Sequence, residues 1–302
     1  MADVFNEAVM ARNSLTVREV KAIRKIYNEW AREARELAKV AIRTNLDEAK
    51  AATELYYQLR NASRQISAEI NGEVSGSINS IGDIMVRTNA RWLSRLGFTE
   101  ESLVLKFSPA KDIAIRSIMT GNLYQKEIPL SDKIWSITES NLKDIYTIIS
   151  KGIATNQSVN DIAIQLEKYL KPGSNLGWSI NSVDGKLYQI HNRQADWRAK
   201  RLARTTLQHA YQKTLVELTK DNPFVSGYLW HAAGNHPCEL CLDRDGLFYT
   251  AETLPLDHPN GQCDFEVVIN QEKAEKDMAG FYENPILYPD IQRFTSGLEY
   301  ID

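Results

Sequence analysis

Cysteine is scarce in this sequence: the 302 residues include three, at positions 238, 241 and 263. A framework of paired disulfides would need an even number of cysteines and an exported chain. The first seven residues, MADVFNE, lack the basic segment and apolar core of a secretion signal. We therefore expect an intracellular chain whose thiols stay reduced.

Long apolar runs are also missing. No stretch is apolar enough over sufficient length to cross a bilayer, so no membrane partner is expected. The apolar content of 43% is nevertheless ample for a packed core, and the length suggests about two domains.

Charge is unevenly distributed along the chain. Residues 235–302 contain 4 basic and 14 acidic side chains, a net charge of −10, whereas the first 234 residues carry +7. A surplus of +7 over this length is far from that of a dedicated nucleic-acid binder. At most a weak contact with DNA is expected from the basic part.

All three cysteines fall in one short stretch that also holds a histidine. Cys238 and Cys241 are two residues apart, and His258 precedes Cys263 by five positions. A Cys-x-x-Cys turn directs two thiolates at one point, and a second turn can supply the other two ligands. The sequence therefore predicts a structural zinc site with these four residues as ligands.

Other roles for the cysteines stay open. They could be small buried hydrophobic residues, although Cys238 is flanked by the polar-turn residues Pro237 and Glu239. A redox-active pair needs electropositive surroundings, and Glu239, Asp243 and Asp245 make these acidic. Metal binding is the favoured interpretation.

Two enzyme classes share parts of this pattern. Zinc deaminases combine Pro-Cys-x-x-Cys with an upstream His-x-Glu, but His209 and His231 are not followed by that glutamate. The pair Asp257-His258 is similar to part of the motif of HNH-type nucleases, in which a histidine acts as the base. If His258 binds zinc it cannot also act as that base. Such a nuclease would also need a second pair of metal ligands after Cys263, and no histidine or cysteine follows that position. We expect no catalysis, and keep a metal-dependent nuclease or toxin-like enzyme as the alternative.

The N-terminal part has helical periodicity. Apolar residues recur at spacings of three and four in two expected helices, one beginning near residue 16 and one over residues 47–70. The first seam is Ile23, Tyr27, Trp30, Ala34, Leu37 and Ala41, and the second is Ala52, Leu55, Leu59, Ala62 and Ile66. Thr16 with Glu19, and Asn45 with Glu48, are candidate caps. The two helices form a hairpin or one rod, and the seam packs internally or binds a partner helix.

The middle of the chain alternates between helical and broken segments. Glycines at 72, 76 and 82 predict a loosened stretch before a helix over 84–96. Helices are predicted over 131–150 and 158–170, the latter capped by Ser158. Residues 174–191 suggest a hairpin turning at 183–186 or an exposed insertion.

A basic helix is expected over residues 194–219. Leu202, Leu207, Leu215 and Leu218 are its candidate core residues. Its cations could line a solvated face or contact phosphate or a partner, and both interpretations stay open. The candidate contact residues are Arg198, Lys200, Arg201 and Arg204.

Beyond residue 225 the pattern changes to short strands. Strands are expected over 228–230, 247–249 and 265–269, the first two flanking the turn at Asp245-Gly246. The breaks at Pro285 and Pro289 suggest that the acidic tail is an extended docking arm or is disordered. The predicted fold class is mainly α, with long N-terminal helices and a small zinc-stabilised α+β unit near the C-terminus.

The order of these parts resembles the tailed-phage minor head proteins, also called head morphogenesis or phage Mu F-like proteins. The resemblance covers about residues 145–268, through the Arg201–Thr206 helix, Trp230, the Cys pair, Asp245-Gly246 and His258-Pro259-Asn260 before Cys263. The family often has two cysteines after His-Pro-Asn, and here Gly261 occupies the first place. The implied organisation is a helical region at 1–130, the family domain at 131–268 with its metal knot at 228–268, and a tail at 269–302.

The resemblance implies a non-enzymatic virion protein. It would be made in the host cytoplasm, enter the procapsid near the portal and act in head assembly. The portal protein is the implied partner, together with other capsid or scaffold proteins. Weak contact with packaged DNA and a part in DNA ejection are further implications.

Overall fold

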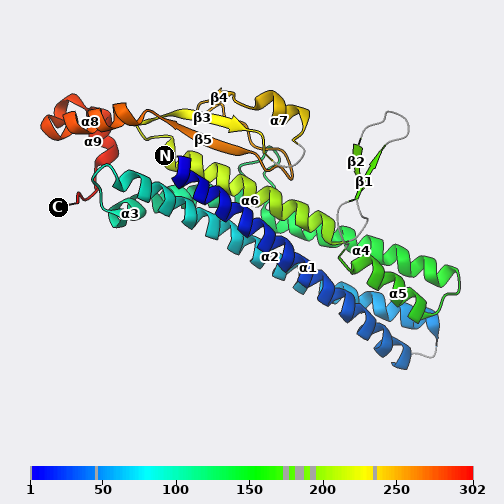
Figure 1. Cartoon of the computed structure of the whole chain (residues 1–302). Helices are drawn as coiled ribbons and strands as arrows, with labels where there is room; N and C mark the ends of the chain where they lie inside the picture. Colours follow the sequence, from blue (N-terminus) through cyan, green and yellow to red (C-terminus); the bar gives the residue numbers. More distant parts are fainter. Residues whose placement is uncertain are drawn as a thin grey trace. The chain divides into compact units, whose positions relative to one another are not determined.

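The computed structural model describes residues 2–44, 47–172, 177–180, 187–190, 195–233 and 237–301. These residues are mainly helical with a small C-terminal sheet, which confirms the predicted fold class (Figure 1). The helices are α1 (Ala2–Thr44), α2 (Glu48–Ser94), α3 (Glu100–Met119), α4 (Leu130–Ala154), α5 (Val159–Leu170), α6 (Asp196–Thr219), α7 (Glu239–Arg244), α8 (Gln271–Glu283), the 3-10 turn η1 (Pro285–Leu287) and α9 (Pro289–Thr295). The strands are β1 (Gly177–Ile180), β2 (Leu187–Ile190), β3 (Val225–His231), β4 (Phe248–Tyr249) and β5 (Asp264–Ile269).

Two compact units are interleaved along the chain. Unit 1 comprises Met1–Val17, Ser75–Glu127 and Arg204–Asp302, and unit 2 comprises Arg18–Val74 and Ile128–Ala203. Three of the four unit boundaries fall inside the helices α1, α2 and α6, and the fourth, after Glu127, falls between α3 and α4. These units do not test the predicted boundaries at residues 130 and 268, which follow a family signature rather than contacts.

Unit 2 contains the predicted seams of the two N-terminal helices. Every seam residue is buried except Leu37 and Ala62, which are half-buried. Asn141 on α4 ties this core together, because its Nδ2 donates to Tyr27 Oη at 2.9 Å and to the Ala195 carbonyl at 3.3 Å. A buried amide with two partners fixes one arrangement of the helices around it.

The predicted N-terminal caps of these helices need correction. Helix α1 already begins at Ala2, so Thr16 lies inside it and its hydroxyl donates to the Arg12 carbonyl at 2.9 Å. Asn45 lies outside the described residues. At α2 the side chain of Asp47 accepts from the Lys50 amide at 3.0 Å, as an N-cap residue does. In contrast, the predicted cap of α5 is confirmed, since Ser158 Oγ accepts from the Asp161 amide at 3.2 Å.

Helix α2 runs through the glycines that predicted a loosened stretch. Gly72 and Gly76 are exposed and have open space around them, so they interrupt no packing. At Gly82 an added Cβ would lie 2.8 Å from Ile115 on α3. This glycine allows α3 to approach α2 closely within unit 1, which explains its place in a helix.

Helix α3 was not predicted. Its N-cap Thr99 accepts from the Ser102 amide at 3.4 Å, and its interior contains Pro109.

The predicted hairpin in the middle of the chain is confirmed in its strands, because β1 and β2 pair antiparallel. The turn predicted at 183–186 lies outside the described residues.

Unit 1 contains the antiparallel sheet, with β3 between β4 and β5 (Figure 1). Tyr228, Trp230, Phe265 and Val267 form its buried face. Trp230 packs edge-on against Phe265, with ring centroids 4.9 Å apart, and Tyr211 on α6 stacks with Phe265 at 6.4 Å. The sheet therefore rests on α6 through aromatic side chains.

The acidic tail is helical, not extended or disordered as predicted. Residues 271–295 form α8, η1 and α9, and Tyr300 pairs with Phe98 in an antiparallel bridge. The prolines that suggested an extended chain begin helical segments instead: Pro285 opens η1 and Pro289 opens α9. Proline is tolerated there because a first-turn N–H has no helical partner.

Within the described residues, no helix has the length and apolar character needed to span a membrane.

Candidate metal centre

The Cys-x-x-Cys turn is formed by the start of α7. Cys238 is the N-cap of this helix, and its carbonyl accepts from the amides of Cys241 at 2.9 Å and Leu242 at 3.0 Å. This turn brings the two sulfur atoms to 3.5 Å from each other. Two thiolates on one tetrahedral zinc lie about 3.8 Å apart, given Zn–S bonds of about 2.3 Å. The turn thus has nearly the geometry of a bound pair.

A tight turn positions the histidine. The Gly261 amide donates to the His258 carbonyl at 2.8 Å, which places Pro259 and Asn260 at the two central positions. Asn260 has φ +68°, and asparagine tolerates this left-handed backbone better than most residues. The His258 ring donates from Nδ1 to the Pro259 carbonyl at 3.1 Å, because a carbonyl can only accept. This tautomer leaves the Nε2 lone pair for a metal.

The predicted ligands come together in one cluster. Potential ligand atoms of Cys238, Cys241 and His258 lie within 4.8 Å of one another, and so do those of Cys241, Asp257 and Cys263. Cys241 belongs to both groups and joins them. The cluster Cys238, Cys241, His258 and Cys263 could therefore hold a metal ion.

The chemistry of these donors fits a soft divalent cation. Burial, followed by the neighbouring thiols of Cys263 and Cys238, raises the pKa of the Cys241 thiol. Burial likewise raises the pKa of Cys263. Without a cation these thiols are held protonated, whereas a bound cation would stabilise the thiolates directly. The turn geometry and the histidine tautomer suit such an ion.

A polar face of α6 holds the ligand-bearing loop. Gln212 Nε2 donates to the Pro255 carbonyl, and its Oε1 accepts from the Asp257 amide at 3.1 Å. His209 Nε2 donates to the Asp257 carbonyl at 2.9 Å, and its Nδ1 contacts the hydroxyl of Tyr124 at 3.1 Å. Burial raises the pKa of Tyr124 to about 12, so its hydroxyl stays protonated and can donate. The contacts from Gln212 and His209 fix the backbone of Pro255 and Asp257, close to the predicted ligand His258.

Sequence reasoning missed this support. Gln208, His209 and Gln212 are buried polar residues spaced as one face of a helix, on a segment evaluated for its leucines, its cations and a deaminase signature at His209. Two amide side chains at i and i+4 on this basic helix, Gln208 and Gln212, were the available signal. Arg12 was also missed: it is 3% exposed, and its Nη1 donates to the Cys263 carbonyl at 3.2 Å.

The cations predicted to contact DNA or a partner have intramolecular partners. Lys200 pairs with buried Asp196 at 2.7 Å, Arg198 donates to Ser140, and Arg201 lies over the Trp197 ring at 5.5 Å. Arg204, in unit 1, donates to Asn260 Oδ1 at 3.3 Å. Arg198 and Arg201 remain exposed, and contact with DNA or a partner stays a prediction.

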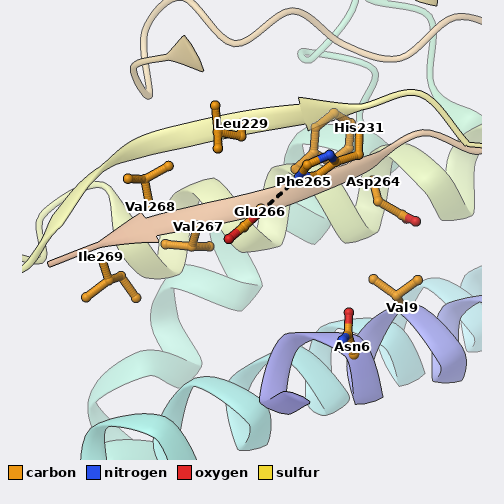
Figure 2. A pocket seen from close by; sticks show the side chains of 10 residues that line it. All are labelled: Asn6, Val9, Leu229, His231, Asp264, Phe265, Glu266, Val267, Val268 and Ile269. Carbon is orange, nitrogen blue, oxygen red and sulfur yellow. Dashed lines mark hydrogen bonds and ion pairs between the residues drawn. The ribbon is translucent and has the colours of Figure 1, made fainter. Parts of the chain in front are cut away.

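A separate groove of about 380 Å³ lies beside the sheet in unit 1. Figure 2 shows it between Asn6 and Val9 of α1 and the strand β5. Its wall is mostly apolar, and the ion pair of His231 with Glu266, at 3.0 Å, lies across β3 and β5. None of the four predicted metal ligands lines this groove.

Comparisons with known proteins gave no family or function for this chain. A scan against protein-family models gave no match, and searches of the curated proteins and of the solved structures gave none either.

Proposed function

We propose that this chain is a minor head protein of a tailed bacteriophage that associates with the portal during head assembly. The observation that carries the proposal is a meeting of signature residues that are far apart in the sequence. Thr205 Oγ1 accepts from the Asn260 amide at 2.8 Å, and Arg204 donates to the same asparagine. The basic helix and the His-Pro-Asn turn, two parts of the family resemblance, thus form one structural element.

In this proposal the metal is zinc and its role is structural. Three thiols and one imidazole form a closed donor set of the kind that structural zinc sites use. The zinc would join α7 to the loop before β5; in α7 Leu240 and Leu242 are exposed, so this helix buries little apolar surface of its own. Cys238, Cys241, His258 and Cys263 would hold it, and it would supply folding free energy rather than a reaction.

The position of His258 supports a structural role over nuclease activity. Its side chain belongs to the thiol cluster, and its Nδ1 donates to a backbone carbonyl. A histidine held in this way as a ligand has no lone pair left to act as a general base. The proposed protein would act through binding, in the procapsid near the portal, after synthesis in the host cytoplasm. Contact with other capsid proteins or packaged DNA would be secondary.

Association with the portal tests the proposal directly. The tagged chain is co-expressed with the portal protein of the same phage genome, and captured complexes and procapsids are assayed for both proteins. We expect co-purification and incorporation into procapsids. A Phe281→Ala variant, which truncates a buried residue of α8, shows whether a general loss of stability is by itself enough to prevent co-purification. Absence of the chain from portal complexes and from procapsids at every assembly stage would contradict the proposal.

Incubation with supercoiled DNA and magnesium or manganese tests the alternative. We expect no nicking by the wild type. Nicking that disappears in His258→Ala, while thermal melting shows that this variant is folded, would favour a nuclease.

A further inference from the structure

We infer that Asp257 is the positioning residue of the metal centre, which its carboxylate organises without binding the ion. This inference rests on the proposed metal site. The carboxylate accepts from the backbone amide of His258 at 2.8 Å through Oδ1 and from that of Cys263 at 3.0 Å through Oδ2. His258 and Cys263 are the two ligands that this loop supplies. One side chain therefore fixes the backbone of both.

Gln208 on α6 completes the arrangement. Its Nε2 donates to Asp257 Oδ2 at 3.1 Å and to the Cys263 carbonyl at 2.6 Å. Gln208 and Asp257 are each 3% exposed, so these hydrogen bonds are shielded from water. The bonds connect α6 to the loop at the point where Cys263 enters β5. Helix α6 thereby sets where the loop ligands stand relative to the Cys-x-x-Cys turn.

Gly261 leaves the space that the carboxylate needs. An added Cβ at this position would lie 2.2 Å from Asp257 Oδ2 and 2.3 Å from Oδ1. Any side chain here would displace the carboxylate from the two amides. This accounts for glycine at the position where the resembled family often has a cysteine, because the carboxylate already occupies the space.

The carboxylate could also be considered as a ligand, since an oxygen of Asp257 lies within 4.8 Å of the Cys241 and Cys263 thiols. We assign it the positioning role because its two oxygens already accept three hydrogen bonds, and because His258 supplies the remaining donor. Carboxylates that hold a ligand in place in this way typically change metal affinity by about 10- to 100-fold when they are mutated.

The test uses cobalt(II) as a spectroscopic probe on the full chain, with affinity measured by competition against a chromogenic chelator. In Asp257→Asn one oxygen is replaced by an amide group that faces N–H donors. We expect affinity to fall about 10- to 100-fold, while the absorption spectrum at saturating cobalt stays like that of the wild type. His258→Ala should instead change that spectrum, because a ligand is lost. Gln208→Met should lower affinity in the same direction as Asp257→Asn, but less.

Leu215→Ala on α6 is the matched control for stability. Leu215 is fully buried and its side chain has no polar group, so its truncation destabilises the same helix without removing a hydrogen bond to the loop. Thermal melting of each metal-free variant identifies any variant that fails to fold. If Asp257→Asn fails to fold, the milder Gln208→Met still tests the inference. Unchanged cobalt affinity in Asp257→Asn would overturn the inference. So would a saturated spectrum altered in Asp257→Asn but not in His258→Ala, which would make Asp257 the ligand. A folded wild type that binds neither cobalt nor zinc would overturn the metal site itself.

Discussion

Arg12 and Asp264 form an ion pair at 2.6 Å, although 252 positions separate them in the sequence. The guanidinium is 3% exposed and also stacks on the Tyr211 ring at 4.9 Å. Burial raises the pKa of Asp264 in spite of this arginine. The pair ties the first turns of α1 to the start of β5, next to Cys263.

Removal of this arginine should be costly. Arg12→Met leaves a largely buried carboxylate without its cation, and we expect unfolding free energy to fall by about 3 kcal/mol. Urea denaturation measures the loss. Arg91→Met is the control, because its pair with Glu7 at 3.1 Å is exposed and is worth less than about 1 kcal/mol. Equal losses in the two variants would contradict the distinction.

Removal of the metal should lower stability strongly. We expect elemental analysis to find one zinc per chain, and a chelator to lower the melting temperature by about 10 °C or more. Cys263→Ser should lose the metal, and added chelator should then change its melting little. A wild-type melting curve that is the same with and without chelator, in protein shown to contain zinc, would mean that the ion does not stabilise the fold.

Two glycines in helices should respond to alanine in opposite ways. Gly72→Ala meets open space on α2 and should stabilise by about 0.5–1 kcal/mol. Gly152→Ala places a Cβ 2.5 Å from Ile162, which is 1% exposed, and should destabilise by about 1–3 kcal/mol. Thermal melting of the two variants gives the signs. Stabilisation by both would show that α4 and α5 can move apart without loss.

Glu217 should make stability depend on acid pH. Burial raises its pKa, but hydrogen bonds from Lys213 and Lys220, with ion-pair distances of 2.6 and 2.7 Å, outweigh burial and leave the pKa below its ordinary value. A lowered carboxyl pKa adds stability above the unfolded-state pKa of about 4.3, and this stability is lost as pH falls through the folded-state value. Glu217→Gln should therefore cost about 1–3 kcal/mol at pH 7 and progressively less below about pH 4.3.

Urea denaturation across this pH range tests the sign. The exposed Glu272→Gln on α8 is the control and should stay within about 0.5 kcal/mol of the wild type at every pH. A Glu217→Gln penalty that grows with acidification would contradict the assignment.

Local patterns in the sequence predicted local structure well. The seams on α1 and α2, the Ser158 cap and the three C-terminal strands all depend on residues within a few positions of one another. The cluster of Cys238, Cys241, His258 and Cys263 was predictable for the same reason, because the members of each pair lie close together in the sequence. At Gly82 the pattern failed because of a contact distant in sequence: this glycine looked like a break but receives Ile115 of α3.

The support of the site could not be predicted in this way. Gln208 and Asp257 are 49 positions apart, and the sequence does not indicate which of several buried polar residues will meet. Helix α3 was not predicted, although Leu103, Phe107 and Ile115 bury a continuous face around Pro109. In the tail, prolines at helix starts were interpreted as interruptions.

The interleaving of the two units bears on the order in which a new chain can fold. The last segment of unit 2 ends at Ala203, so this unit can close while the rest is still being translated. Unit 1 joins residues 1–17 to residues 204–302. At about 5–20 residues per second, the first turns of α1 wait about 13–50 s after synthesis for the sheet that Arg12 meets, which ends at Ile269. During that time Arg12, which is buried in the finished fold, has neither its ion-pair partner Asp264 nor the Tyr211 ring, so the first turns of α1 lack part of their packing and are open to misassembly.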